Sequence, residues 1–196
     1  MIVPIEPYAI KGVIWYQGEN NAGNAAPYAD LMIGLIRSWR RDFQQGDFPF
    51  LFVQLARIGG PPNPPAPSPR DGWALLRDAQ TRTLKSPNTG MVVCFDTTNG
   101  NIHPPWKVPV GERLALLARS MVYGEGPASK YSCPLFQSAE RRGANAILHL
   151  SNANDGLGLR DGTVHDDGTI TYTPGTAVND LFLMHADGTS SPAKAR

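Results

Sequence analysis

The stretch KGVIWYQGENNAG, residues 11–23, changes character halfway along. Residues 12–16 are apolar, and the residues after them bring together amides, a carboxylate and glycines. A short, continuous apolar run is typical of a strand that is buried on both faces of a parallel sheet. We therefore predict a buried strand over residues 12–16, followed at its carboxyl end by a polar loop.

A helix is predicted to follow this loop. Pro27 stands at a position suited to the first turn of a helix. The apolar residues after it recur at the spacing of one helical face. This predicted buried face consists of Tyr28, Leu31, Met32, Leu35, Ile36 and Trp39.

The same order of strand, loop and helix recurs further along the chain. The later segments are a strand FLFVQL (50–55), a proline-rich loop (59–69), a helix DGWALLRDAQTRTL (71–84), a strand GMVVCFD (90–96) that ends in an acid, and a helix marked by Val110, Leu114, Leu117, Ala118 and Met121. This alternation indicates an α/β fold with a parallel sheet. Ligands of such sheets bind at loops beyond the carboxyl ends of the strands. The polar clusters at residues 17–21 and 99–103 are predicted to lie there.

After about residue 125 the pattern changes to short strands. Residues 145–151, 168–173 and 180–185 are predicted strands, and the tripeptides NDG, RDG, DDG and ADG are predicted tight turns. We therefore expect two parts, an α/β domain over residues 1–126 and a β-rich segment over residues 127–196. Both are expected to be partial, since the first begins abruptly and the second ends without a closing element.

Composition excludes several classes of function. The 196 residues are 41% hydrophobic, enough for a core, and the net charge of +1 argues against nucleic acid or an anionic membrane as partner. No apolar run reaches the roughly 18 residues that a membrane span needs. Cys94 and Cys133 are compatible with two free thiols or one disulfide, and no Cys/His cluster indicates a metal or other cofactor.

The first polar cluster has residues suited to binding an oxyanion. Gly18 lets the backbone approach a ligand closely, and an Asn amide can donate a hydrogen bond to a developing negative charge. Glu19 can accept a hydrogen bond from a substrate hydroxyl or orient a neighbour. The alternative is a polar turn that caps the next helix.

The second cluster contains a candidate general base. His103 lies on a predicted loop and precedes two prolines that restrict its backbone. The alternative is an ordinary surface histidine. A hydrolase that uses His103 also needs a nucleophile, yet the chain has no GxSxG motif and no serine in a glycine-rich turn between strand and helix.

Taken together, these blocks resemble the sialate O-acetylesterase-like family of the SGNH/GDSL hydrolases. The resemblance covers about residues 1–125, and the β-rich remainder is more loosely similar to an accessory segment of bacterial members. It is specific because several uncommon blocks recur in order. They are KGVIWYQGENNAG (11–23), FPFLFVQLA (48–56), WALLRDAQ (73–80), NTGMVVCFD (88–96) and IHPPWKVPVGERLALLA (102–118).

The resemblance implies an SGNH-like three-layer fold and hydrolysis of acetyl esters on sugars by a serine nucleophile and a histidine base. The histidine of the family's IHP block matches His103. The oxyanion-binding residues match Gly18 and an amide that is either Asn20 or Asn21, with Asn20 standing where the family usually has Ser. Further residues expected to shape the pocket are Gln17 and Glu19.

Two departures from the family pattern affect the expected chemistry. The block that carries the family's nucleophilic serine precedes the segments matched here, so we expect the serine to be missing from this chain. The family's DIHP is NIHP in this sequence, with Asn101 at the position of the acid. An amide does not stabilise an imidazolium as a carboxylate does, and Asp96 is a second candidate for that role.

The sequence therefore predicts part of a carbohydrate O-acetylesterase that needs no cofactor or metal. The rival hypothesis is a non-catalytic glycan-binding or vestigial module, with stacking surfaces from Trp15, Tyr16, Trp73 and Trp106. An incomplete sheet also predicts an exposed apolar face and self-association, unless a missing N-terminal half covers it. The resemblance implies that the parent protein is exported.

Overall fold

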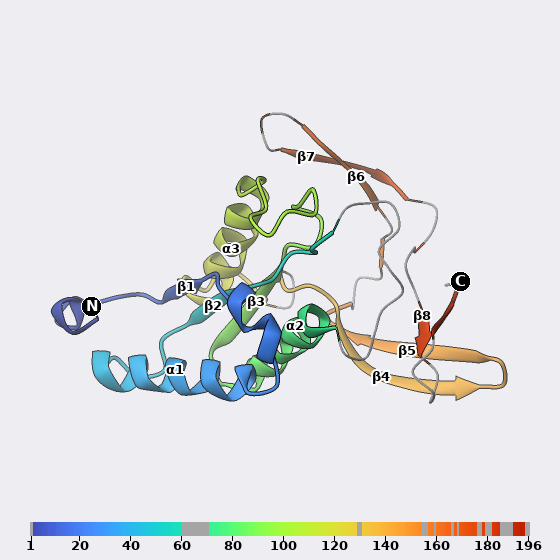
Figure 1. Cartoon of the computed structure of the whole chain (residues 1–196). Helices are drawn as coiled ribbons and strands as arrows, with labels where there is room; N and C mark the ends of the chain where they lie inside the picture. The colour runs from blue at the N-terminus through green and yellow to red at the C-terminus, as the bar shows by residue number, and fades with distance from the viewer. Residues whose placement is uncertain are drawn as a thin grey trace.

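The computed structural model describes residues 2–59, 71–128 and 131–153, and after these residues 157–158, 160–165, 167, 169–175, 178, 182–184 and 190–194. The first part of the chain contains three strands and three α-helices joined by short 3-10 turns (Figure 1). In chain order these elements are η1 (Val3–Ile5), β1 (Val13–Trp15), η2 (Glu19–Asn24), α1 (Tyr28–Phe43), β2 (Phe50–Gln54), α2 (Gly72–Arg82), η3 (Thr83–Lys85), β3 (Thr89–Val93) and α3 (Val108–Met121).

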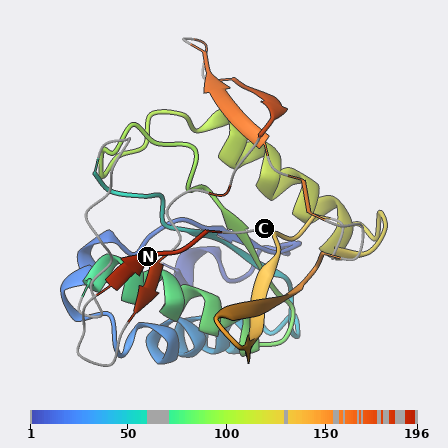
Figure 2. The same ribbon diagram turned by 90° about the vertical axis from the view of Figure 1, so that its right-hand side faces the viewer.

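The three strands form a parallel sheet in the order β1-β2-β3. Helices α1 and α2 cover one face of this sheet, and α3 covers the other (Figures 1 and 2). The predicted α/β fold with three layers is thus confirmed. All three strands end at the same side of the sheet, which we call the carboxyl edge.

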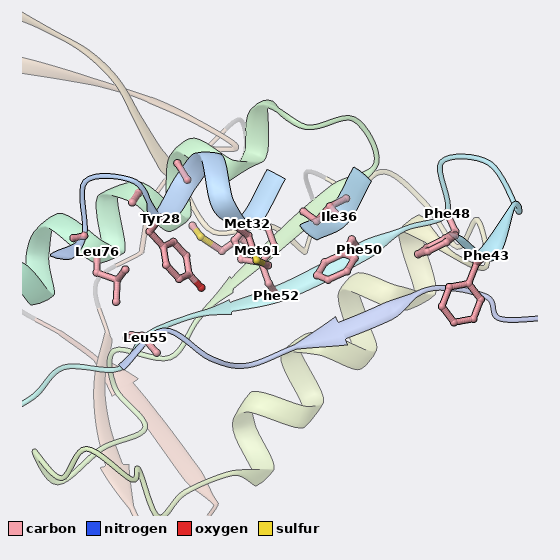
Figure 3. Packing of buried hydrophobic residues seen from close by; sticks show 13 residues of the cluster. Tyr28, Met32, Ile36, Phe43, Phe48, Phe50, Phe52, Leu55, Leu76 and Met91 are labelled. Atoms are coloured by element: carbon pink, nitrogen blue, oxygen red, sulfur yellow. The ribbon is translucent and has the colours of Figure 1, made fainter. Parts of the chain in front are cut away.

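Alternation along β2 explains the two cores, because successive side chains of a strand point to opposite faces. Phe50 and Phe52 face α1 and α2, where they pack with Met32, Ile36 and Leu76 (Figure 3). The intervening residues of β2 face the helix on the other side. That second cluster contains Leu51, Val53, Val92, Val110, Leu114 and Leu117.

Two predictions of burial are wrong in detail. Residues 12–16 were expected to be buried on both faces, but the Ile14 side chain is 68% exposed, because α3 packs on β2 and β3 and leaves β1 uncovered. Leu31 was expected on the buried face of α1 and is 60% exposed. The buried stripe instead runs through Tyr28, Ala29, Met32, Ile36, Arg40 and Phe43.

The remainder of the chain forms antiparallel hairpins. They pair β4 (Leu135–Arg142) with β5 (Asn145–Ser151), β6 (Arg160–Val164) with β7 (Ile170–Pro174), and β8 (Phe182–Met184) with β9 (Ser190–Pro192). The predicted strand at 145–151 is confirmed, and those at 168–173 and 180–185 correspond to β7 and β8. The prediction of a tight turn at RDG is wrong, since residues 160–162 belong to strand β6.

Several predicted features lie outside the described residues, namely nearly all of the proline-rich loop, the NDG and ADG turns and most of the DDG turn. Of the alternatives for the two cysteines, the structure shows free thiols at Cys94 and Cys133. Within the described part of the chain, no helix has the length and apolar character needed to span a bilayer. In that same part, no three His, Cys, Asp or Glu side chains gather as metal ligands.

Candidate active site

The QGENN loop, residues 17–21, begins the carboxyl edge directly after β1. Gly18 is buried and has φ 152°, a conformation that side chains rarely adopt. A Cβ atom at this position would lie 3.1 Å from Nε2 of Gln80 and 3.3 Å from a Leu76 methyl group. The loop therefore needs glycine here for both its backbone conformation and its close packing on α2.

A buried glutamine on α2 holds this loop against the sheet. The Gln80 side chain is 2% exposed, and its Nε2 donates to the backbone carbonyls of Gln17 at 3.2 Å and Val53 at 3.3 Å. Its Oε1 accepts from the backbone N–H of Leu55 at 2.9 Å. One side chain thus joins the loop after β1 to the end of β2. Gln80 was not predicted from sequence, since nothing in the helical pattern of residues 71–84 distinguishes it.

A second glutamine orients one of the two candidate oxyanion amides. Gln17 Nε2 donates to Asn21 Oδ1 at 2.9 Å, and the Tyr28 hydroxyl donates to the Gln17 carbonyl at 3.0 Å. With its oxygen occupied, Asn21 keeps Nδ2 available as a donor. Asn20 is exposed, whereas Glu19 is half-buried. Neither of these two side chains hydrogen-bonds to any of the residues described here.

The predicted base lies on the loop after β3. His103 is exposed, and the next residue, Pro104, is buried. Asn101 Oδ1 accepts a 2.9 Å hydrogen bond from the backbone N–H of His103, so this amide stabilises the loop rather than touching the imidazole. Within the described residues, the imidazole of His103 has no hydrogen-bond or ion-pair partner.

Asp96, the second candidate acid, has other partners. Its carboxylate accepts two hydrogen bonds from Arg113 at 2.7 and 2.6 Å and one from the Tyr172 hydroxyl at 2.9 Å. Burial by itself raises the pKa of Asp96, but these hydrogen bonds and the charge of Arg113 outweigh it and hold the pKa below its usual range. Among the described residues, no hydrogen bond or ion pair joins Asp96 to His103.

Side chains at the carboxyl ends of the three strands contact one another. The Tyr16 hydroxyl lies 3.6 Å from Cys94 Sγ, and that thiol donates to the Gln54 carbonyl at 2.9 Å. Lys107 Nζ lies 4.6 Å from the centre of the Tyr16 ring. Burial, and after it the neighbouring Cys94, raises the pKa of Tyr16, so this hydroxyl is protonated at neutral pH. The ends of all three strands are thereby linked.

The structure thus places both predicted clusters at one edge of the sheet. It brings Gln17, Gly18 and Asn21 together, and it ties Asn101 to the backbone of His103. It shows no contact between the imidazole and either candidate acid among the described residues. The catalytic roles of these residues stay predictions.

Comparison with known proteins gives a consistent family. A family model described as "Carbohydrate esterase, sialic acid-specific acetylesterase" matches residues 3–118. Sialate O-acetylesterase of Rattus norvegicus is 36% identical over 165 residues, and that of Homo sapiens is 34% identical over 170 residues. Each alignment covers 77% of this chain, but only 30% of the rat protein and 31% of the human protein. The chain thus spans about a third of these relatives' length.

A solved structure shares both fold and sequence with the chain. The crystal structure of a carbohydrate acetylesterase from Xanthomonas citri superposes with a TM-score of 0.67 at 37% identity. The superposition covers 90% of this chain and 42% of that protein. It extends beyond the matched residues 3–118 into the β-rich segment. On the evidence of the family model and this shared fold, the chain belongs to the sialic acid-specific acetylesterase family of carbohydrate esterases.

Proposed function

We propose that this chain forms part of a carbohydrate O-acetylesterase and supplies its oxyanion-binding loop and its histidine base. The observation that carries the proposal is the geometry of the QGENN loop. Gln17 fixes the carbonyl oxygen of Asn21, which leaves the Asn21 amide as a donor beside the tightly packed Gly18. Such a preorganised donor stabilises the negative charge that develops on an ester carbonyl.

The histidine completes the proposed chemistry. In ester hydrolysis a hydroxyl attacks the acetyl carbonyl, a base takes the hydroxyl proton, and the same group returns a proton to the departing sugar oxygen. His103 is exposed at the carboxyl edge and has no described partner that would block it. The serine nucleophile was predicted to lie outside these 196 residues. Consistent with this prediction, Ser38, Ser86 and Ser120 lie away from the carboxyl edge.

The test measures acetate release from an O-acetylated sugar by the full-length gene product that contains these residues. Replacing Asn21 by alanine is expected to lower kcat about 100-fold, the loss typical of removing one oxyanion donor. Asn20→Ala is the matched control, because Asn20 carries the same amide next to Asn21 but its side chain is exposed. The Asn20→Ala variant should retain most of the activity. An inactive full-length protein, or equal effects of the two substitutions, would contradict the proposal.

The non-catalytic alternative makes a different prediction. It expects the full-length protein to bind acetylated sugar without releasing acetate. Two of its proposed stacking residues are engaged inside the fold: Trp15 packs against Trp39 and Phe50, and Trp73 Nε1 donates to the Ala56 carbonyl at 2.7 Å. We therefore favour the catalytic reading.

A further inference from the structure

Tyr28, the first residue of α1, places a phenol hydroxyl against the QGENN loop. Its side chain is buried in the core cluster that also contains Met32 and Leu76 (Figure 3). The hydroxyl donates to the backbone carbonyl of Gln17 at 3.0 Å and also to Oε1 of the same residue at 3.4 Å. Burial raises the pKa of Tyr28, so the hydroxyl keeps its proton at neutral pH. One buried donor thus contacts both the main chain and the side chain of Gln17.

The hydrogen bond to Oε1 fixes which end of the Gln17 amide faces Asn21. A side-chain amide carries its acceptor and its donors on opposite sides of one planar group. With Oε1 turned toward Tyr28, Gln17 presents Nε2 to Asn21, and Nε2 donates to Asn21 Oδ1 at 2.9 Å. Asn21 must then keep its own Nδ2 on the side away from Gln17. The donation runs from Tyr28 through Gln17 to Asn21, and it leaves Nδ2 as the donor at the end.

The second contact of the hydroxyl concerns the peptide that joins Gln17 to Gly18. Its carbonyl accepts from Tyr28 and also from Gln80 Nε2, at 3.2 Å. Because the carbonyl and the N–H of a trans peptide point in opposite directions, the Gly18 N–H points away from both of these donors. This N–H has no hydrogen-bond partner among the described residues. Since Gln80 holds the same peptide, loss of the Tyr28 hydroxyl should act mainly through the Gln17 side chain.

The partners of the hydroxyl separate its role from that of the ring. The ring fills space in the core, and phenylalanine would fill the same space without the hydroxyl. Both acceptors of the hydroxyl belong to Gln17, and the carbonyl has a second donor in Gln80. What the hydroxyl alone provides is the orientation of the Gln17 amide.

We propose that the Tyr28 hydroxyl is a positioning group of the oxyanion site, acting through Gln17 to direct Asn21 Nδ2 toward the substrate. Tyr28 itself touches no reacting atom. Without the hydroxyl the Gln17 amide is free to flip, and Asn21 then turns Nδ2 toward Gln17 instead of the ester oxygen. This inference rests on the proposed function for the reaction, and it adds to the site a residue from the core side of α1.

The test measures acetate release from an O-acetylated sugar by the full-length gene product and its Tyr28→Phe variant. We expect kcat to fall about tenfold with KM nearly unchanged, because an oxyanion contact is made only in the transition state. This loss is smaller than the roughly 100-fold loss that removal of a donor causes. Thr83→Val is the matched control, since it removes a buried hydroxyl that donates to the Ala79 carbonyl at 3.1 Å rather than to the loop. It should leave kcat unchanged.

Two further variants test the direction of the effect. If Tyr28 acts through Asn21, Tyr28→Phe should lower kcat by less than about twofold in a protein that already carries Asn21→Ala. Gln17→Glu keeps an acceptor for Tyr28 but cannot donate to Asn21 Oδ1, so Asn21 should turn Nδ2 toward the new carboxylate. Gln17→Glu should therefore lower kcat about as much as Asn21→Ala.

Three kinetic results would overturn the inference: an unchanged kcat in Tyr28→Phe, an equal loss in Thr83→Val, or the same effect of Tyr28→Phe with and without the Asn21 amide. A wild-type protein that releases no acetate would refute the proposed function instead. The side-chain amide signals of Asn21, followed by NMR in the 196-residue chain, then decide the inference without any activity. A shift of these signals in Tyr28→Phe but not in Thr83→Val supports it, and unchanged signals in Tyr28→Phe overturn it.

Discussion

At the scale of single residues, the candidate site depends on side chains that do no chemistry themselves. Gln80 holds the QGENN loop on β2, and Gln17 orients Asn21. The sequence predicted Gly18 and the two clusters because they follow predicted strands of a parallel sheet, at the edge where such sheets bind ligands. It did not predict Gln80, whose three partners come from two other segments of the chain. Contacts of this kind become visible only when the elements are placed in space.

Gly18→Ala tests the requirement for glycine in the loop. Its positive φ and the contact with Gln80 make a Cβ unfavourable, and we expect a loss of about 1–3 kcal/mol in the free energy of unfolding together with reduced activity. Chemical denaturation measures the loss. Gly34→Ala is the control, since open space surrounds that helical glycine and alanine should stabilise α1 by about 0.5–1 kcal/mol. A similar change in the free energy of unfolding in the two variants would argue against the described conformation of Gly18.

Gln80→Leu tests the buried glutamine. Leucine has a similar volume but leaves the N–H of Leu55 without its partner, whereas the Gln17 carbonyl loses one of two donors and keeps the Tyr28 hydroxyl. Each unsatisfied buried group costs about 1–3 kcal/mol, so we expect a clear fall in the denaturation midpoint. Gln137→Leu, on the exposed strand β4, is the control and should have little effect. A Gln80 variant as stable as the wild type would contradict this role.

At the scale of secondary-structure elements, hydrophobic periodicity located the strands and helices of the α/β part correctly. It was wrong where burial depends on a neighbour. Leu31 fits the helical period but points away from the sheet, and Ile14 fits a buried strand although no described helix covers it. The hairpin strands β4, β6 and β9 were missed because their residues are largely polar or small.

The exposed side of β1 leads us to predict that the chain self-associates. β1 pairs with β2 along one side, and no strand of the described residues pairs with its other side. An apolar, unpaired strand edge promotes self-association. Ile14→Lys should therefore raise the monomer fraction of the 196-residue chain in sedimentation measurements. Leu31→Lys is the control, because this side chain is similarly exposed but lies on a helix. A wild-type chain that is monomeric at high concentration would refute the prediction.

At the scale of the whole molecule, one polar network joins the α/β part to the β-rich segment. Tyr172 of β7 donates to Asp96 and accepts from Arg113 of α3 at 2.9 Å. Figure 2 shows the β6–β7 hairpin beside the end of α3. The sequence predicted the two parts but not this contact, since Asp96 and Tyr172 are 76 positions apart. Pairings between distant residues leave no local pattern from which to predict them.

The network makes stability depend on pH. The pKa of Asp96 is lower in the folded than in the unfolded chain. Its contribution to the free energy of unfolding is therefore fully present above the unfolded pKa of about 3.9, and it is lost as the pH falls through the folded pKa. Asp96→Asn should therefore lower the melting temperature at neutral pH, and the difference should shrink below about pH 4. Asp78→Asn, from an exposed ion pair with Arg82, is the control and should change little. A difference for Asp96→Asn that is independent of pH would exclude this electrostatic origin.

The measurement that tests the central claim most directly compares His103→Ala with His149→Ala in the full-length gene product, using acetate release from an O-acetylated sugar. Both side chains are exposed, but only His103 lies at the carboxyl edge. We expect His103→Ala to lower kcat about 100-fold or more and His149→Ala to leave it unchanged. Equal activity of the two variants would show that His103 is not the base and would contradict the account.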